Sequence, residues 1–434
     1  MEHYKIGIVG LWHLGCVLVA SWLKLGNEVI GVDFEPDLIG QLRKGKAPLY
    51  EPNLDETIAQ SIKDLKVSFS TDSASLKNCD YIFLSYDTPV DDNDHYDLTI
   101  LEKAIEKIAP HLKANSTLII SSQVPVGTSQ QFAKKLQNTT PSIEVVYSPE
   151  NLRLGEAISN YLNPGHIVIG ADNQKAANAA NKLFSAIEAN YLHMNLASAE
   201  MTKHAINSFL ATSITFANQL ADVCSLSGAD FHLVAQAMKQ DHRIGKKAYL
   251  KAGIGFSGGT LGRDLQILHL LNQMKGNGSF PIFGNTWQYN RERPFLIIEK
   301  ISAILGSLKN KTISILGMTY KPGTSTLRRS IPLEMAHTLV KKGAKVKVYD
   351  PKANWAEADL QGIQIVDNPN LIAQGSHFLL LLTEWQEFKS LNYNDLAKTM
   401  KEKKFFDPYS FLDSQHSLLQ SFGYKIFTIN TLMS

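Results

Sequence analysis

The chain has 434 residues, which at roughly 150 residues per domain is enough for two or three domains, each with its own core. Lysine and arginine number 43 against 41 aspartate and glutamate residues, so a formal charge of +2 argues against a nucleic-acid partner or an anionic membrane. Three cysteines exclude a disulfide scaffold and show no metal-ligand spacing, and no apolar run approaches the roughly 18 residues of a membrane span. The N-terminus enters a strand-like run without a basic leader, so we expect a cytoplasmic globular protein without a metal.

Short apolar runs alternate with segments of helical periodicity in the first half of the chain. Strands are predicted at 6–9, 28–32, 81–85, 117–121, 145–147 and 167–169, and a helix at 14–25 separates the first two. Strands that alternate with helices favour right-handed strand–helix–strand units and a parallel sheet.

The pattern changes at residues 197–226, which contain neither glycine nor proline. They predict a helix far longer than the average of about 11–12 residues. Its apolar positions allow burial on more than one side, so it suits a spine between two lobes, a dimer interface or an internal core helix.

Beyond residue 308 the alternation returns, with strands predicted at 313–317, 346–349 and 378–382. We therefore predict an α/β fold of two Rossmann-like parallel-sheet domains joined by a long central helix and a helical dimerisation region. The predicted domains are 1–196, 197–300 and 308–434.

The first glycine turn lies at residues 10–15 (GLWHLG), between a predicted strand and a predicted helix, and Asp33 ends the next strand. This context is typical of dinucleotide binding, in which a helix N-terminus holds the diphosphate and the acid binds the ribose hydroxyls. Trp12 stands where a glycine normally lets the backbone approach the phosphates, so the turn alone would also fit any tight strand–helix connection. Because an acid at position 33 favours NAD over NADP, we expect Gly10, Gly15 and Asp33 to bind NAD and Trp12 to weaken or shift it.

Further segments carry a resemblance to a known family. In chain order they are 45–54 (GKAPLYEPNL), 70–72, 88–89, 124–128 (VPVGT), 148–153 (SPENLR), Lys203 with Asn207, 241–245 (DHRIG), 255–264 (GFSGGTLGRD), 321–332 and 383–385. In order and spacing they resemble the UDP-glucose/GDP-mannose dehydrogenase family. The resemblance implies an NAD-binding N-terminal domain, a helical dimerisation region, a C-terminal domain for the nucleotide sugar, and a homodimer. It also implies two successive oxidations at C6 of a nucleotide-linked hexose, which yield two NADH and a uronic acid.

The resemblance also implies roles for individual residues. The catalytic set is Lys203, Asn207, Glu150 and Asp264, with Thr260 at the position of the family's nucleophile. The cofactor set is Gly10, Trp12, Gly15, Asp33, Thr88, Pro89, Gln123, Arg263 and Arg328. The substrate set is Glu150, Arg153, Lys203, Asn207, Arg243, Lys251, Gly255, Phe256 and Lys321, with Arg243 reaching into the partner's sugar site.

The residue types suit these roles. Lys203 and Asn207 are one helical turn apart, and an ammonium beside an amide suits the stabilisation of an oxyanion. Glu150 and Asp264 are the acid/base candidates. Taken without the family, the residues favour a surface ion pair for Lys203 and a helix cap for either carboxylate. Five of the eight arginines lie in the matched segments, where a planar guanidinium can clamp a diphosphate.

The resemblance is incomplete at the reacting centre. The family's second oxidation depends on a cysteine thiolate that captures the aldehyde, and Thr260 stands in its place. A threonine hydroxyl needs an adjacent base to attack a carbonyl, whereas cysteine has accessible thiolate near neutral pH. Leu154 and Gln123 replace a glutamate and a threonine of the family, Arg263 replaces a lysine, and Tyr409 replaces an arginine.

These departures leave three hypotheses. In the first, which we favour, a single hydride transfer gives a 6-aldehyde or a ring ketone. In the second, the chain completes the four-electron oxidation to the uronic acid through a hydrated aldehyde. In the third, it binds a nucleotide sugar without catalysis.

Overall fold

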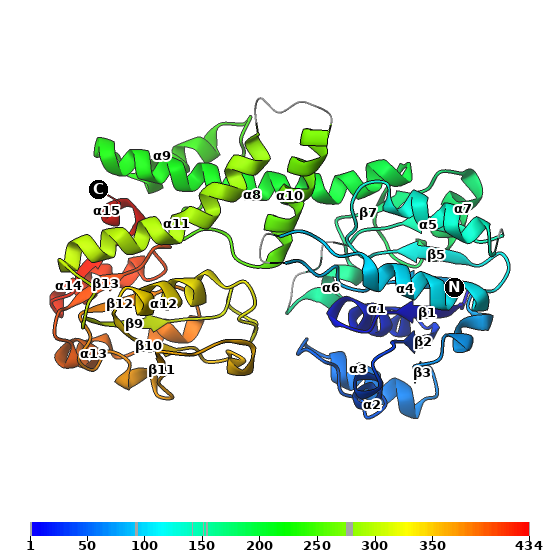
Figure 1. The fold of residues 1–434 in the computed structure, drawn as a ribbon, viewed down its shortest axis with the longest axis horizontal. Coiled ribbons are helices and arrows are strands. Elements are labelled where there is room, and N and C mark those ends of the chain that lie inside the picture. Colours follow the sequence, from blue (N-terminus) through cyan, green and yellow to red (C-terminus); the bar gives the residue numbers. More distant parts are fainter. Residues whose placement is uncertain are drawn as a thin grey trace. The chain divides into compact units, whose positions relative to one another are not determined.

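The structure is a computed structural model that describes residues 2–91, 94–140, 142–150, 152, 155–274 and 281–433. The chain forms two compact units, Met1–Ile206 and Asn207–Ser434. The boundary falls inside one uninterrupted helix, α8 (Leu196–Ser227), so the long helix predicted at 197–226 is confirmed (Figure 1). Within the described ranges, no helix is both long enough and apolar enough to cross a bilayer.

The first unit contains, in its described residues, an eight-stranded sheet of order β3-β2-β1-β4-β5-β6-β7-β8. Its strands are β1 (Lys5–Val9), β2 (Glu28–Val32), β3 (Val67–Ser70), β4 (Tyr81–Leu84), β5 (Thr117–Ile120), β6 (Glu144–Tyr147), β7 (His166–Gly170) and β8 (Asn190–Met194). Strands β1 to β6 are parallel, as predicted. Strand β7 pairs antiparallel with β6 through Tyr147 and Gly170, and β8 runs parallel to β7. A short apolar run predicts a strand but not its direction, which is why the sequence did not reveal this reversal.

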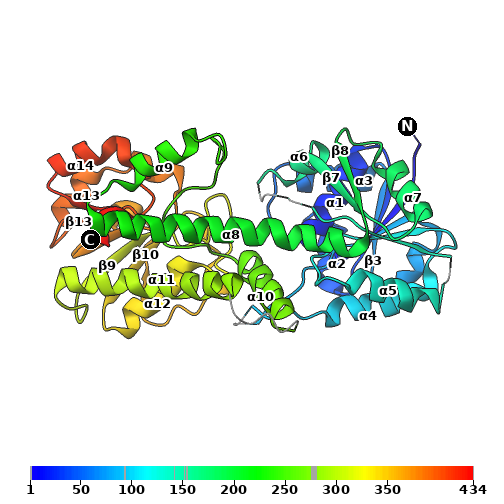
Figure 2. The same ribbon diagram turned by 90° about the horizontal axis from the view of Figure 1, so that it is seen from above.

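Helices cover both faces of this sheet. They are α1 (His13–Lys24), α2 (Pro36–Leu42), α3 (Leu54–Lys63), α4 (Thr99–Ile108), α5 (Thr128–Gln137), α6 (Ala157–Leu162) and α7 (Gln174–Phe184). Figure 2 shows α4 and α5 on one face and α7 on the other. Helix α1 is apolar on nearly every side and is buried along most of its length, where its Trp22 packs against Phe83 and Phe184. Such a helix belongs in the interior of its layer, and its N-terminus is therefore fixed firmly beside the sheet.

The second unit contains a six-stranded parallel sheet of order β11-β10-β9-β12-β13-β14 among the residues that are described. Its strands are β9 (Thr312–Leu316), β10 (Lys345–Tyr349), β11 (Ile363–Ile365), β12 (Phe378–Leu381), β13 (Lys404–Phe406) and β14 (Lys425–Phe427). Strand β12 is entirely apolar and entirely buried, as expected of a strand covered on both faces. This sheet has the same order as the first six strands of the other unit, which confirms the prediction of two Rossmann-like sheets.

The remaining helices of the second unit are α9 (Phe231–Gln240), α10 (Gly259–Met274), α11 (Ile282–Leu305), α12 (Ile331–Lys341), α13 (Tyr393–Thr399), α14 (His416–Ser421) and α15 (Ile429–Leu432). One core joins α8, α11 and α12 to the sheet, through residues that include Ala221, Ile301, Met335 and Ile315. The helical middle of the chain and the second sheet therefore share a single core.

Candidate functional site

The turn between β1 and α1 is built around two glycines that leave no room for a side chain. Gly10 has a φ of 94°, and its N–H donates to the carbonyl oxygen of Val32 at 2.9 Å. A Cβ on Gly15 would lie 1.8 Å from the carbonyl oxygen of Gly10, so α1 starts in direct backbone contact with the turn. In the described residues 10–16, α1 has neither a side-chain N-cap nor an acidic residue in its first turn. Its N-terminus therefore keeps the polarity that suits a diphosphate.

Trp12 and Asp33 lie at the same turn. Trp12 directly precedes α1, and its side chain is 43% exposed. Asp33 is buried at the end of β2, where its carboxylate accepts the N–H of Leu11 at 2.7 Å and that of Glu35 at 3.1 Å. Burial raises the pKa of Asp33, and the backbone hydrogen bonds oppose that shift. The structure thus brings Gly10, Trp12, Gly15 and Asp33 together as the sequence predicts.

The predicted cofactor residues after β4 and β5 also meet. Thr88 is buried, and its hydroxyl donates to the carbonyl oxygen of Gln123 at 2.5 Å. Pro89, next to Thr88, is exposed. The two segments follow neighbouring parallel strands, so their meeting places them at the carboxyl edge of the sheet, where nucleotides bind in such folds.

Lys203, near the start of α8, reaches the segment that follows β6. Its Nζ donates to the main-chain carbonyl oxygen of Glu150 at 2.6 Å. The carboxylate of Glu150 accepts the N–H of Leu152 at 2.5 Å. The sequence analysis predicted Lys203 and Glu150 in one site. The structure shows that they are in contact, and that Lys203 binds the main-chain carbonyl oxygen of Glu150 and not its carboxylate. Arg153 and Leu154 lie outside the described residues.

Asn207, one turn further along α8, pairs with Asp264 of α10. The Asn207 amide donates to Asp264 Oδ2 at 2.5 Å, and Asp264 is fully buried. The guanidinium of Arg263 is also buried, with Nε 3.8 Å from Asp264 Oδ1. Thr260, one turn earlier on α10, is exposed. The structure therefore joins Asn207, Asp264 and Arg263 into one buried polar group of the second unit.

The loop before α10 carries two predicted substrate residues, Gly255 and Phe256. Gly255 has a φ of 120°, and a Cβ on it would lie 2.7 Å from Asn290 Oδ1. The Asn290 side chain accepts the N–H of Phe256 at 2.7 Å and donates to its carbonyl oxygen at 2.9 Å. The sequence analysis missed Asn290, since an asparagine inside a helix gives no signal that it binds a distant backbone.

Lys251 is held in an ion pair. Its Nζ lies 2.6 and 2.8 Å from the two carboxylate oxygens of Glu384, and 5.0 Å from the centre of the Tyr409 ring. Tyr409 packs closely on this loop, because a Cβ on Gly253 would lie 2.0 Å from its ring. The residue that replaces the family's arginine is therefore part of the wall beside Lys251.

The remaining predicted cations lie on the surface of the second unit or close to it. Arg243 is exposed, and its guanidinium donates to the carboxylate of Asp241 at 2.6 and 3.0 Å. Arg328 is exposed, and Lys321 Nζ lies 5.6 Å from the centre of the Tyr320 ring. Arg243 and Arg328 are thus accessible, and the roles of all three remain predictions.

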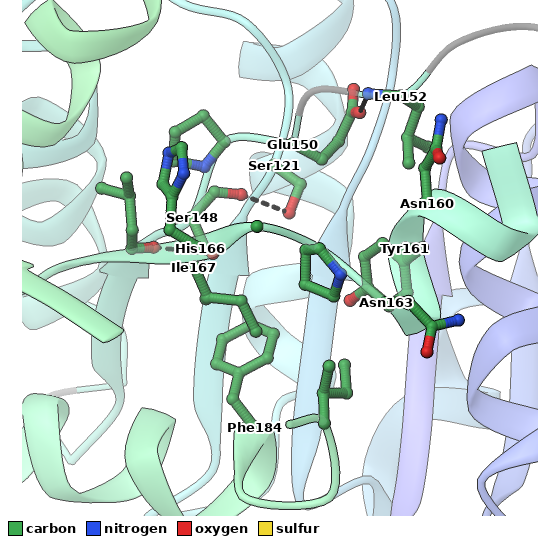
Figure 3. A pocket seen from close by; sticks show the side chains of 15 residues that line it. Ser121, Ser148, Glu150, Leu152, Asn160, Tyr161, Asn163, His166, Ile167 and Phe184 are labelled. Atoms are coloured by element: carbon green, nitrogen blue, oxygen red, sulfur yellow. Dashed lines mark hydrogen bonds between the residues drawn. The ribbon is translucent and has the colours of Figure 1, made fainter. Parts of the chain in front are cut away.

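A cavity of about 260 Å³, which the sequence analysis did not predict, lies beside Glu150 in the first unit. Figure 3 shows Glu150 near its upper rim and Phe184 at its lower end. Polar residues on its wall include Ser121, Ser148, Asn160, Asn163 and His166. The Ser121 hydroxyl donates to the Ser148 carbonyl oxygen and the Ser148 hydroxyl to that of Val168, so both hydroxyls already bind backbone.

Comparison with known proteins gives three family-model matches. They are the UDP-glucose/GDP-mannose dehydrogenase family NAD binding domain at residues 4–188, the central domain at 197–292 and the UDP binding domain at 314–414. Together they follow one another along most of the chain.

Whole-chain relatives agree with these matches. The chain is 32% identical over 426 residues to UDP-glucose 6-dehydrogenase TuaD of Bacillus subtilis, covering 97% of this chain and 92% of the relative. It is 30% identical over 436 residues to UDP-glucose 6-dehydrogenase of Rickettsia bellii, covering 98% and 99% of the two chains. Among solved structures, a UDP-glucose dehydrogenase of Pyrobaculum islandicum matches with a TM-score of 0.86 at 27% identity, covering 93% of this chain and 97% of that one.

Proposed function

The chain belongs to the UDP-glucose/GDP-mannose dehydrogenase family, and on that premise we propose that it oxidises a UDP-glucose-like nucleotide sugar at C6 by a single hydride transfer. The general activity, NAD-dependent dehydrogenation of a nucleotide sugar, follows from the family matches. One observation carries the more specific proposal. Thr260 stands at the family's nucleophile position, is exposed in the first turn of α10, and has no base in contact with its hydroxyl among the described residues.

The first unit fits NAD. The tight turn at Gly10, against which α1 starts in direct backbone contact at Gly15, leaves the uncapped N-terminus of α1 as the cradle that a diphosphate needs. NAD, when bound, accepts the hydride. The residues of this unit that would hold it are Gly10, Trp12, Gly15, Asp33, Thr88, Pro89 and Gln123. Burial and the backbone bonds of Asp33 keep its carboxylate at one place at the end of β2, where a ribose can be bound.

The polar side chains of α8 would act on the sugar. Loss of a hydride from C6 requires that the hydroxyl proton leave and that the oxygen's negative charge be stabilised. Lys203 and Asn207 supply an ammonium and an amide on the same helix face. Asp264 fixes the orientation of the Asn207 amide, and we assign to Asp264 the hydroxyl proton. Glu150, whose carbonyl oxygen holds Lys203, contributes to substrate binding. The products of this step are a 6-aldehyde and NADH.

The second oxidation needs a nucleophile that captures the aldehyde. A threonine hydroxyl without a neighbouring base is a poor one, so we expect the aldehyde to be released. This proposal is tested with a panel of UDP-, GDP- and dTDP-hexoses. The NADH formed per sugar is counted, and the product is identified by mass. One NADH and an aldehyde is the expected result. Two NADH and a uronic acid would establish the full four-electron oxidation instead.

The same assay distinguishes the proposed enzyme from a protein that binds a nucleotide sugar without catalysis. Trp12 at the cofactor turn, together with Thr260, is what favours that candidate. NADH formation that depends on the sugar and is lost in Lys203→Ala would exclude it. Nucleotide-sugar binding with no NADH from any hexose of the panel would favour it.

A stripe of exposed apolar residues on α8 supports the proposal of a homodimer. Phe209, Phe216 and Val223 repeat every seven residues, with exposed fractions of 73, 49 and 59%, and so lie on one face of the helix. Exposed apolar stripes of this size mark contact surfaces. We propose that residues 197–300 form the dimerisation region between a cofactor part (1–196) and a nucleotide-sugar part (308–434). Light scattering on the double variant Phe209→Glu, Phe216→Glu should show monomers, and an unchanged mass would refute this assignment.

A further inference from the structure

The turn between β5 and α5 is held by a carboxylate from another helix. Glu200 of α8 accepts the N–H of Gly127 at 2.5 Å and the N–H of Ser129 at 2.7 Å, one on each carboxylate oxygen. Gly127 is the N-cap residue of α5, with a φ of 98°, and has no side chain with which to cap the helix. Glu200, which is fully buried, therefore supplies the cap from a distance of 71 to 73 residues along the chain.

A second buried side chain of α8 holds the other end of the same turn. His204, one helical turn after Glu200, has no exposed surface, and its Nε2 lies 2.8 Å from the carbonyl oxygen of Val124. Because a carbonyl can only accept, Nε2 carries the proton in this contact. The preceding residue, Gln123, accepts the Thr88 hydroxyl. Three side chains thus fix the backbone of the turn at both ends.

Glu200 is a costly choice for a purely structural cap. Burial raises its pKa, against the effect of the Ser129 and Gly127 hydrogen bonds and of His204. A carboxyl group whose pKa is higher in the folded chain stabilises the fold below its unfolded pKa, and that contribution is lost as the pH rises through the folded value. The shape of the turn depends on both acceptor oxygens of the Glu200 carboxylate.

The turn lies where the proposed function needs it. Gln123 and Thr88 belong to the predicted cofactor residues, and Lys203, between Glu200 and His204 on α8, binds the Glu150 carbonyl. Resting on that function, we propose that Glu200 and His204 are positioning residues for NAD, which hold the turn of residues 123–129 in its cofactor-binding shape. Neither was among the residues that the sequence analysis selected.

Glu200→Gln tests the carboxylate with the least change of shape. The amide offers one acceptor oxygen and turns an NH₂ group toward the second backbone N–H, so one buried donor loses its partner. We expect the dissociation constant of NAD, measured by calorimetry, to rise about tenfold. The affinity for the nucleotide sugar should stay within about twofold.

Glu144→Gln is the matched control. Glu144 starts β6 at the opposite edge of the sheet, where it pairs with Lys175 at 3.0 Å, and it takes no part in the proposed site. Both variants lose one carboxylate of the first unit. Thermal unfolding of the ligand-free chains reports the loss of stability in each variant, and NAD binding is measured well below both transitions, where only Glu200→Gln should bind NAD more weakly.

The pH dependence gives a readout that a general loss of stability would not produce. As the pH falls through the pKa of Glu200, which burial raises above its usual value, protonation turns one of its acceptor oxygens into a hydroxyl, so NAD affinity of the unmodified chain should fall, and that of Glu200→Gln should stay flat. The other titratable groups around it are His204 and Lys203 of α8 and Asp172, which accepts the Leu196 N–H and the Gln130 amide beside α5. His204→Gln removes the imidazole and keeps an N–H donor, so this variant should bind NAD almost normally and keep the pH dependence. His204→Leu, which has no donor, should weaken NAD binding severalfold.

Two results would overturn the inference. If the unmodified chain binds NAD and Glu200→Gln equals Glu144→Gln at every pH, the positioning role is wrong while the proposed function stands. If the unmodified chain binds no NAD at all, both the proposed function and the inference that rests on it are wrong.

Discussion

Gly15 and Gly40 provide a sharp test of the dinucleotide turn, because the same substitution should have opposite effects at the two sites. Both glycines are helical and lie in the first unit, Gly15 in α1 and Gly40 in α2. A Cβ on Gly15 would be 1.8 Å from the carbonyl oxygen of Gly10, well inside the 3.0 Å that real Cβ contacts respect. A Cβ on Gly40 would meet nothing within 4 Å.

The magnitudes follow from what has to move. At Gly15 the obstacle is backbone, so α1 must shift by more than 1 Å from the turn, and the penalty is at the upper end of overpacking, about 3 kcal/mol. At Gly40 alanine removes only the conformational freedom of glycine in a helix, for a gain of about 0.5–1 kcal/mol. For a unit of this size these values correspond to a melting temperature about 6–12 °C lower for Gly15→Ala and about 1–4 °C higher for Gly40→Ala.

Thermal unfolding of the two variants beside the unmodified chain measures these shifts, and calorimetry below the transition measures NAD binding. Gly15→Ala should lose NAD affinity as well as stability, since α1 moves away from the turn that holds the diphosphate. Gly40→Ala should bind NAD unchanged. Equal melting temperatures for the two variants would show that the close approach of α1 is not a property of this protein.

Three further predictions concern the proposed chemistry. Trp12→Gly should tighten NAD binding at least threefold in calorimetry, because a glycine lets the backbone approach the phosphates, and an unchanged affinity would contradict the idea that Trp12 obstructs the site. Thr260→Cys should raise the yield from one NADH per sugar to two, with a uronic acid identified by mass, since a thiolate can capture the aldehyde; Thr260→Ser is its control and should still give one. Asn207→Ala removes the donor 2.5 Å from the buried Asp264 and should lower kcat by at least about 10²-fold in steady-state assays, and a kcat loss below tenfold would remove Asn207 from the catalytic set.

The sequence predicted those parts of the fold that depend on local patterns, such as a run without helix breakers or a short apolar run. Residues 197–226 lack any helix breaker, and the observed helix, Leu196–Ser227, exceeds the predicted range by one residue at each end. The apolar runs predicted β1, β2, β4, β5, β6 and β7 in the first unit and β9, β10 and β12 in the second, and their alternation with helices predicted a parallel sheet. The sequence analysis missed β3, β8, β11, β13 and β14. The reversal at β7 stayed hidden because strand direction depends on which partner is chosen, and residues 166–170 have the same apolar character in either direction.

Candidate site residues could be selected where a residue type suits the chemistry of a matched segment, and not where a side chain binds backbone. Lys203, Asn207 and Asp264 could be selected because an ammonium, an amide and a carboxylate are reactive groups in a matched segment. Glu200 and Asn290 act on N–H and carbonyl groups of loops that are distant in sequence, and nothing in their neighbours marks that. The sequence does show that Glu200 is a charged residue on the long helix. A charge at a buried position of a helix needs a partner, and this is the signal that could have identified Glu200.

The two units place an aspartate at the same topological position, and the comparison shows what decides whether such a residue can bind a ribose. Asp33 directly follows β2 and Asp350 directly follows β10, and each of these strands lies next to the first strand of its sheet. The carboxylate of Asp350 accepts six hydrogen bonds, from the N–H groups of Met318, Thr319, Lys352 and Ala353, the Thr319 hydroxyl and the Trp385 indole. A carboxylate has about four lone-pair sites, so Asp350 is saturated by its own chain and serves the fold alone. Asp33 accepts the N–H groups of Leu11 and Glu35 and keeps capacity for hydroxyl donors. Of these two acids, Asp33 therefore has fewer protein donors around it, as its predicted role toward ribose hydroxyls requires.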